Sequence, residues 1–340
     1  MNSSSLDYSV SLLLFALCFS CVSYKTIEIG TYNSASITFP PEARTIMIVN
    51  NAAQQPDNSI IQDLDETAKE PTLSLSADSL AYLFCLSLGK AIAESPVFDD
   101  VLLCEDTLRR DSVFLISRPF TPKYMDFFCD EHDVDALITL DKLYFRTYFN
   151  WGLLTVIITG ELKALCRGYQ TALSIPFTDS LLWVTEETIY FNDINEFTAE
   201  DLQFCLRYLT EYSGEEMHKH FVPYWENDKR WFYTNITSDW KRATSYAIVE
   251  NWEAAANEWR HIFDKAKKWK QKVMLASNLA LYYEIKGDFQ KALEYARIAD
   301  SLSKEFAEED NPLNVRQQSY LEKLTKRAEN EETLSLQLRE

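Results

Sequence analysis

The residues between Cys129 and Asp135 form the densest group of potential metal ligands and acid–base residues in the sequence. Within seven positions they supply a thiol, an imidazole and four carboxylates, from Cys129, Asp130, Glu131, His132, Asp133 and Asp135. Such groups bind a divalent metal or transfer protons when they converge on one point. No second cluster completes a coordination shell, so we predict a polar helix end rather than a metal site.

Other catalytic signatures are absent from the sequence. No GxSxG nucleophile elbow or HExxH zinc helix occurs, and the seven glycines never cluster into a phosphate-binding loop. His218 and His220 are two residues apart on a predicted helix, so they point to opposite sides and cannot chelate a metal together. We therefore predict no catalytic residues and no cofactor. The alternative is an enzyme whose site lies around Asp130 to Asp135, with His132 and Asp133 essential for activity.

The amino terminus carries an apolar run from Ser9 to Phe19, followed by Ser20 and Cys21. The run is too short to cross a bilayer, which needs about 20 apolar residues, but its length suits a secretory signal. A small residue followed by cysteine resembles the lipobox of bacterial lipoproteins. The resemblance implies that residues 1–20 are removed and that the Cys21 thiol is acylated. An ordinary cleaved signal peptide and an uncleaved anchor are the alternatives.

Composition restricts the partners that the chain can bind. The formal net charge is −19, and a polyanion is repelled by nucleic-acid phosphates and by anionic lipid headgroups. Membrane attachment must then come from the lipid on Cys21, and the expected partner is a protein or peptide. Five further cysteines stand singly in apolar surroundings and are predicted to be small buried hydrophobes: Cys85, Cys104, Cys129, Cys166 and Cys205.

Residues 44–195 have the pattern of an α/β domain, preceded by an extended linker over residues 21–43. Strands are predicted at residues 44–50, 98–104, 134–145, 153–166 and 169–177, and helices that run to about residue 95 and residue 132. Ser76, Asp78 and Ser79 are candidate caps of the first helix, and Thr121 with Pro122 begins the second. Early crossover helices followed by late hairpins predict a mixed sheet covered by helices on one face. The alternation of apolar and polar residues in Leu153 to Cys166 predicts a half-buried strand, with a membrane-inserting hairpin as the alternative.

Residues 196–330 are predicted to be all helical. Six of the eight tryptophans fall between Trp225 and Trp269, which indicates an aromatic core. Residues 236–305 contain two segments that align with the tetratricopeptide pattern of antiparallel helix pairs, with Asn251 and Gly287 in the turns. A generic helical bundle is the competing interpretation.

Two flanking helices complete this prediction. The helices at residues 199–221 and 315–328 are expected to cap the repeat stack, because two repeats alone leave apolar faces uncovered. Residues 331–340 are predicted to be a disordered tail.

Three segments together carry a family resemblance: Cys21 in its lipobox-like setting, the run IMIVNN at residues 46–51, and NLALYYEIKGDFQKALEYA at residues 278–296. They resemble a family of uncharacterised bacterial lipoproteins with a carboxy-terminal tetratricopeptide region. The α/β domain also resembles amino-terminal domains of Tol-system and curli-secretion proteins. These resemblances imply a lipoprotein of the bacterial cell envelope, anchored in the outer membrane and facing the periplasm.

The repeat alignment implies a concave groove for a peptide. Its first-helix positions would include Trp240, Thr244, Asn278 and Leu281, and Asn278 matches the position at which many peptide-binding repeats place a backbone-clamping asparagine. The leading hypothesis is therefore a non-catalytic, lipid-anchored adaptor. An enzyme, or a subunit of an envelope secretion or pore assembly, are the alternatives.

Overall fold

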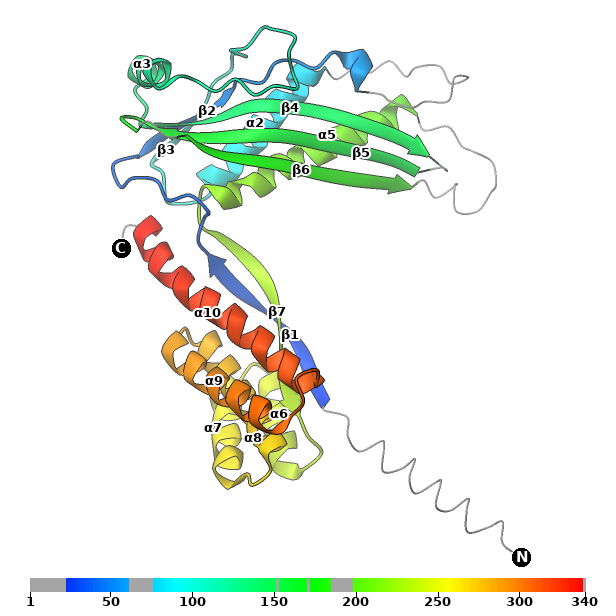
Figure 1. The fold of residues 1–340 in the computed structure, drawn as a ribbon, viewed down its shortest axis with the longest axis vertical. Helices are drawn as coiled ribbons and strands as arrows, with labels where there is room; N and C mark the ends of the chain where they lie inside the picture. The colour runs from blue at the N-terminus through cyan, green and yellow to red at the C-terminus, as the bar shows by residue number, and fades with distance from the viewer. Residues whose placement is uncertain (1–22, 61–75, 151–152, 170–171, 185–197, 339–340) are drawn as a thin grey trace, which may run out of the picture. The chain divides into compact units, whose positions relative to one another are not determined.

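The computed structural model describes residues 23–60, 76–150, 153–169, 172–184 and 198–338 (Figure 1). The predicted leader and Cys21 lie outside these residues. The chain divides into two compact units. We call Ser34–Tyr224 with Thr333–Glu340 the sheet unit, and Met1–Asn33 with Trp225–Glu332 the helical unit.

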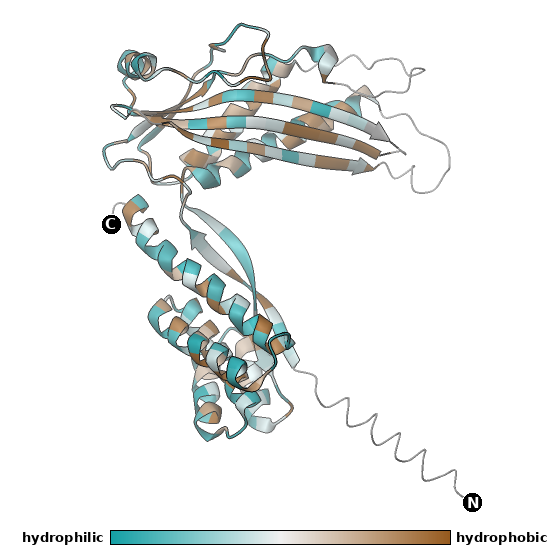
Figure 2. Cartoon of the chain, viewed as in Figure 1, coloured by the Kyte–Doolittle hydropathy of each residue, from teal (hydrophilic) through white to brown (hydrophobic). Residues whose placement is uncertain are grey.

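The sheet unit contains a five-stranded mixed sheet in the order β3-β2-β4-β5-β6. Its strands are β2 (Thr45–Asn50), β3 (Asp100–Leu103), β4 (Ala136–Asn150), β5 (Leu153–Cys166) and β6 (Leu173–Val184). Strand β2 is parallel to both β3 and β4, whereas β4, β5 and β6 form antiparallel pairs. The mixed sheet agrees with the prediction from the sequence, and Figure 2 shows hydrophobic and hydrophilic residues interspersed along its three long strands.

Helix α2 (Ala77–Ala93) connects the parallel strands β2 and β3. Parallel neighbours need such a crossover, because the end of the first strand and the start of the second lie at opposite edges of the sheet. The helix begins where the sequence indicates, since the Ser76 side chain accepts a hydrogen bond from the Ser79 backbone N–H. Its apolar side packs on one face of the sheet, where Ile46 and Ile48 of β2 are fully buried.

Helix α3 (Pro122–His132) covers the opposite face, so the prediction of helices on one face only is wrong. Thr121 caps this helix and Pro122 occupies its first turn, as predicted. Met125 and Phe128 pack with Met47 and Val49, the β2 residues that alternate with Ile46 and Ile48. Because successive strand residues point to opposite faces, both rows of β2 need a cover.

Helix α5 (Ala199–Glu216) belongs to the sheet unit, which corrects the predicted boundary at residue 195 and its role as a cap of the helical repeats. Leu202, Leu206 and Leu209 pack in the same core as α2. Gly214 permits the close approach of the two helices, because a Cβ at this position would lie 2.6 Å from the Phe84 carbonyl oxygen. A short 3₁₀ segment, Met217–His220, follows the helix.

Two strands that the sequence analysis missed form a ribbon: β1 (Ser23–Asn33) and β7 (Tyr224–Thr234). They run in opposite directions, since the Thr234 hydroxyl donates to Ser23 Oγ (2.9 Å) while the Thr31 hydroxyl donates to the Glu226 carbonyl (3.1 Å). The predicted linker over residues 21–43 is therefore wrong for Ser23–Asn33. The chain beyond it also packs, because Ile37, Phe39 and Ala43 are buried in the sheet-unit core.

The remaining described elements of the helical unit are helices. They are α6 (Ser238–Ile248), α7 (Trp252–Lys265), α8 (Trp269–Ile285), α9 (Phe289–Phe306) and α10 (Pro312–Leu338), the last of which extends into the sheet unit. The first four form two helix hairpins at the predicted positions. Asn251 caps α7, and Gly287 takes a positive φ of 74° in the turn before α9.

Residues 331–338 of the predicted disordered tail are instead the end of α10. The Gln337 side chain accepts from the Ala35 backbone N–H (2.9 Å) and donates to the Ala35 carbonyl (3.0 Å). Leu338 packs against the sheet-unit core. Hydrophilic residues predominate along α10 in Figure 2. Because of this polar composition, the end of the helix resembles a solvated tail in the sequence. Among the described helices, none is long and apolar enough to span a membrane.

Candidate functional site: a polar cleft, an apolar hollow and an internal clamp

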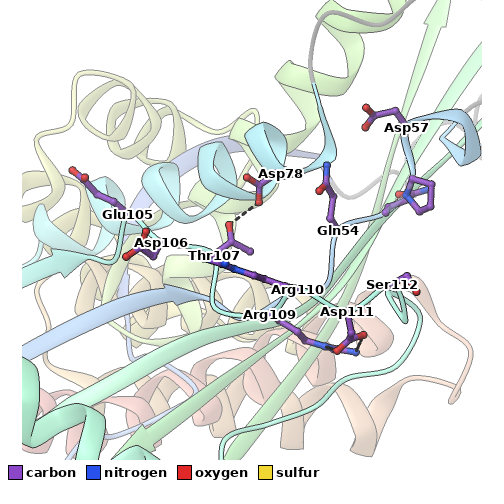
Figure 3. Close-up of a pocket in the computed structure, with 12 residues that line it drawn as sticks. Gln54, Asp57, Asp78, Glu105, Asp106, Thr107, Arg109, Arg110, Asp111 and Ser112 are labelled. Atoms are coloured by element: carbon purple, nitrogen blue, oxygen red, sulfur yellow. Dashed lines mark hydrogen bonds and ion pairs between the residues drawn. The ribbon is translucent and has the colours of Figure 1, made fainter.

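A polar cleft of about 730 Å³ lies at the carboxyl ends of the parallel strands of the sheet unit (Figure 3). Three separate segments supply its acidic side chains: Asp57 follows β2, Asp78 lies in the first turn of α2, and Glu105 follows β3. Ligands of open α/β sheets bind at this edge, because the loops that leave the strands and the helix amino terminus converge there. The position therefore makes the cleft a candidate binding site.

A chain of hydrogen bonds holds the loop after β3 in place at the cleft. Asn50 Nδ2 donates to Thr107 Oγ1 (3.3 Å), and the Thr107 hydroxyl donates to Asp78 Oδ1 (2.6 Å), the dashed line in Figure 3. The Leu108 backbone N–H donates to the Asn50 carbonyl (3.1 Å). These bonds attach the loop after β3 to the end of β2 and to the start of α2.

Arg109 shapes the adjoining loop. Its buried guanidinium donates to both Asp111 carboxylate oxygens (2.7 and 3.0 Å) and to the carbonyls of Val113 and Ile116 (2.7 Å each). The bonds from Arg109 lower the pKa of Asp111 to about 2, so this carboxylate stays ionised. Arg109 therefore stabilises its own loop and is not available to bind a ligand.

The remaining charges favour a cationic or neutral polar ligand. The cleft is lined by five carboxylates, of Asp57, Asp78, Glu105, Asp106 and Asp111, and by two guanidinium groups, of Arg109 and Arg110. An anionic phosphate would meet this excess of negative charge. No group of three or more side chains suited to a metal occurs in the described part of the chain.

A smaller hollow of about 260 Å³ adjoins the cleft and brings two thiols into its wall. Burial raises the pKa of Cys85 to about 12, and burial is also the largest cause that raises the pKa of Cys104. Both thiols therefore stay protonated near neutral pH, whereas a nucleophilic cysteine needs a lowered pKa. Neither Cys85 nor Cys104 is therefore activated as a nucleophile.

The cluster from Cys129 to Asp135 lies elsewhere, at the amino ends of β2 and β4. Asp133 ends α3 in a left-handed conformation with a φ of 54°, and Asp135 Oδ2 accepts from the Arg44 and Thr45 backbone N–H groups (2.8 Å each). Asp130 pairs with Arg167. The cluster is therefore a polar helix end, and the Asp135 carboxylate attaches it to the start of β2.

The histidines also take separate positions. His132 packs against Phe128 with ring centroids 4.4 Å apart and the rings tilted by 43°. His220 Nδ1 lies 3.1 Å from the Ser36 hydroxyl, and burial lowers its pKa, while His218 contacts the Glu215 carbonyl. His218 and His220 do not form a joint site.

In the helical unit, Asn278 forms an internal clamp. The Tyr233 backbone N–H donates to Asn278 Oδ1 (2.7 Å), and Asn278 Nδ2 donates to the Tyr233 carbonyl (2.9 Å). Asn278 thus binds an extended backbone as the repeat resemblance implied, but this backbone is β7 of the same chain. Gln317 of α10 secures the segment further by donating to the Tyr233 hydroxyl (2.8 Å).

The other predicted groove residues are also interior. Trp240 and Leu281 are 1% and 0% exposed, and Thr244 is half-buried. The prediction that these positions face an open peptide groove is therefore corrected, because the space that an external peptide would need is filled by β7 and by the packed helices.

A hollow of about 450 Å³, with both charged and apolar side chains in its wall, lies beside β1 in the same unit. Four successive β1 residues line it, from Lys25 to Glu28, together with Phe232, Ala247, Ile248, Glu250 and Trp252. Successive residues point to opposite faces of a strand, so a hollow that touches all four lies along the edge of the strand. In the two-stranded ribbon, β7 occupies only one edge of β1.

The turn between α6 and α7 forms the rim of this hollow. Ile248 and Val249 are 55% and 70% exposed, and neither is needed to close the core. Exposed β-branched residues beside such a hollow are typical of a binding surface. This site is not recognisable in the sequence, because its residues come from segments more than 200 positions apart. The one local signal is the apolar pair Ile248 and Val249 at the predicted helix end.

Comparison with protein-family models shows that residues 43–233 match the family described as "Domain of unknown function (DUF8603)". The chain belongs to the DUF8603 family. Residues 241–326 match a second model, "Domain of unknown function (DUF6340)". No curated protein matches the chain significantly.

The DUF8603 region contains the whole sheet with α2, α3 and α5, and it ends at Tyr233, within β7. The DUF6340 region begins inside α6 and covers the helix hairpins and much of α10. The polar cleft therefore belongs to the DUF8603 region, while the clamp joins Asn278 of the second region to the last residue of the first.

Proposed function

We propose that this protein is a non-catalytic adaptor of the bacterial cell envelope, tethered by an acylated Cys21, whose helical unit binds an extended segment of a partner protein. The hollow beside the edge of β1 that no described strand pairs with carries the proposal. The tether rests on the short apolar leader and the lipobox-like Ser20–Cys21 pair. The helix hairpins are consistent with tetratricopeptide-like repeats, and the mixed sheet with the Tol and curli-secretion resemblance.

The partner segment would add to β1 as a third strand. A strand edge supplies backbone N–H and C=O groups that bind an extended peptide without regard to its sequence, and adjacent pockets select its side chains. The hollow with Ile27, Phe232 and Trp252 in its wall would take an apolar side chain. We therefore expect a segment with apolar residues at alternate positions.

The internal clamp supports this location. Asn278 already holds β7 in the place that the repeat pattern assigns to a peptide, and β1 pairs with β7. A partner strand on the free edge of β1 would continue this ribbon. The site is consequently displaced by one strand from the groove that the sequence indicated.

The alternatives draw less support. The long β4–β5 hairpin has its apolar row buried against α2 and α5, with Val156, Ile158 and Leu162 fully buried, so that row is not free to face lipid. An enzymatic site around His132 and Asp133 would lack two of the neighbouring carboxylates, because Asp135 accepts from the Arg44 and Thr45 backbone N–H groups and Asp130 pairs with Arg167.

The adaptor proposal is tested with a library of extended peptides displayed against the full chain. Bound peptides should share alternating apolar residues, and Ile248→Asp should weaken their binding by about tenfold or more, because it places a charge at the apolar rim. Val315→Asp is the matched control, since Val315 is 53% exposed on α10 and does not line the hollow. Equal binding by both variants would refute the site.

The tether is tested separately by mass spectrometry of the mature amino terminus. We expect residue 21 to be the first residue and to carry a thioether-linked diacylglycerol. An unmodified Cys21 thiol, or a retained leader, would refute the tether without affecting the peptide test.

A further inference from the structure

Helix α5 presents an ordered aromatic row on the surface of the sheet unit. Phe204, Tyr208 and Tyr212 are spaced four residues apart and are 51%, 49% and 45% exposed. Their rings lie nearly parallel, with centroid separations of 6.1 and 6.3 Å and interplanar angles of 19° and 7°. Because the rings already support one another, little side-chain entropy would be lost on binding.

The row continues onto the edge of the sheet. Trp183 of β6 packs on Phe204 with ring centroids 5.2 Å apart, and β6 is the last strand of the sheet. Aromatic side chains of this kind dominate the energy of protein interfaces.

The charges on this face distinguish between possible occupants. The chain as a whole carries −19, which opposes association of two copies at most orientations. Along β6 the only charged residue is Asp179, whose carboxylate accepts from the Ser180 N–H (2.8 Å) and the Ser213 hydroxyl (3.1 Å). Beside the aromatic row, Arg207 and Glu211 are paired at 3.0 Å, and at its end the carboxylate of Glu216 raises the pKa of Tyr212.

We propose that a second copy of this chain covers the row, with the two α5 helices antiparallel about a two-fold axis at Tyr208. Phe204 of one copy then meets Tyr212 of the other, because these residues are equally far from Tyr208 along the helix. Arg207 of each copy approaches Glu211 of the other, so the charges that flank the axis attract. A two-fold interface requires such self-complementarity.

The proposal is independent of the peptide site in the helical unit. It is tested in cells that express the full chain with Tyr208→Cys, by adding a mild oxidant and separating the proteins without reductant. Two packed helices bring residues at a two-fold axis close enough for a disulfide. We expect a band at twice the mass of the chain. Co-expressed Phe204→Cys and Tyr212→Cys copies should also cross-link to each other.

The matched control is Tyr82→Cys, which replaces a tyrosine that is 41% exposed on α2 of the same unit, and the unsubstituted chain measures any background from its own cysteines. Equal cross-linking of Tyr82→Cys and Tyr208→Cys, or a Tyr208→Cys product of any other mass, would overturn the proposal.

A second measurement does not depend on disulfides. The mass of the native protein in solution should correspond to two copies, and Tyr208→Glu should raise the dissociation constant at least about tenfold, because it places two carboxylates at the axis. Tyr208→Phe should leave it unchanged. A native protein that stays monomeric at concentrations of tens of micromolar would refute the interface.

Discussion

The internal clamp leads to a sharp prediction: Asn278→Ala should destabilise the helical unit although it removes only one small polar group. Asn278 is fully buried, and its two hydrogen bonds both go to the Tyr233 backbone. The alanine cannot replace either bond. The substitution therefore leaves a buried N–H and a buried C=O without a partner.

The magnitude follows from the number of groups left unpaired. Each buried polar group without a partner costs about 1–3 kcal/mol, so two groups cost on the order of 2–6 kcal/mol. A urea slope of roughly 2 kcal/mol per M then gives a fall in the unfolding midpoint of about 1–3 M. The helix itself contributes little to the change, because alanine is a better helix former than asparagine.

Tryptophan fluorescence during urea unfolding is the suitable assay. Six of the eight tryptophans lie between Trp225 and Trp269, so the signal reports mainly on the helical unit. Asn257→Ala is the matched control, because Asn257 is exposed on α7 and bonds only to Arg260 among the described residues. It should move the midpoint by less than about 0.3 M.

An Asn278→Ala midpoint within the range of this control would refute the reasoning. It would mean that the Tyr233 backbone is satisfied by another partner, such as water, and that the clamp does not hold β7 in the repeat stack. A large loss of midpoint in Asn257→Ala would equally show that the assay does not isolate the clamp.

Three further predictions concern stability. Gly214→Ala should lower the melting temperature measured by circular dichroism by several degrees, because its Cβ would lie 2.6 Å from the Phe84 carbonyl oxygen; an unchanged melting temperature would show that α2 and α5 can separate freely. Glu284→Ala should cost about 3–5 kcal/mol in urea unfolding, because Arg230, which is 2% exposed, loses its buried carboxylate; a cost below 1 kcal/mol would contradict this. Burial raises the pKa of Asp141 above its usual 3.8, so the folded protein holds this proton to a higher pH than the unfolded chain, and the resulting stabilisation is complete below pH 3.8 and is lost as the pH rises through the raised pKa. Asp141→Asn should remove that contribution, so the urea midpoint of the native chain minus that of the variant should be larger at pH 4 than at pH 7; a difference independent of pH would refute it.

Local patterns in the sequence were sufficient for most elements of the sheet unit. Leu153 to Cys166 alternates in burial as its apolar pattern predicts, and Ser76 and Thr121 cap helices at the expected positions. These features depend on residues a few positions apart, whose spacing alone indicates which side of an element is buried. The turn residues Asn251 and Gly287 were recognisable for the same reason.

Long-range pairing could not be predicted in this way. Strands β1 and β7 are about 200 residues apart, and each is too polar to indicate a strand by itself; Thr31 is buried only because it bonds to Glu226 and Asp228 of β7. The aromatic spacing of α5 predicted a helix but could not indicate that its apolar side packs on the sheet. The polar cleft was likewise missed, although Asn50 after a buried strand and Asp78 at a helix start are signals that could have located it.

The amino-acid sequence by itself determined the positions of most helices and strands, the acidic character of the chain, and the presence of an asparagine suited to clamp a backbone. Only the tertiary structure decided which backbone Asn278 holds, which core α5 joins, and which strand edge stays open. The physical reason is that periodicity and capping are local properties, whereas the partner of a buried amide or of an apolar helix side is set by segments that meet only when the chain has folded.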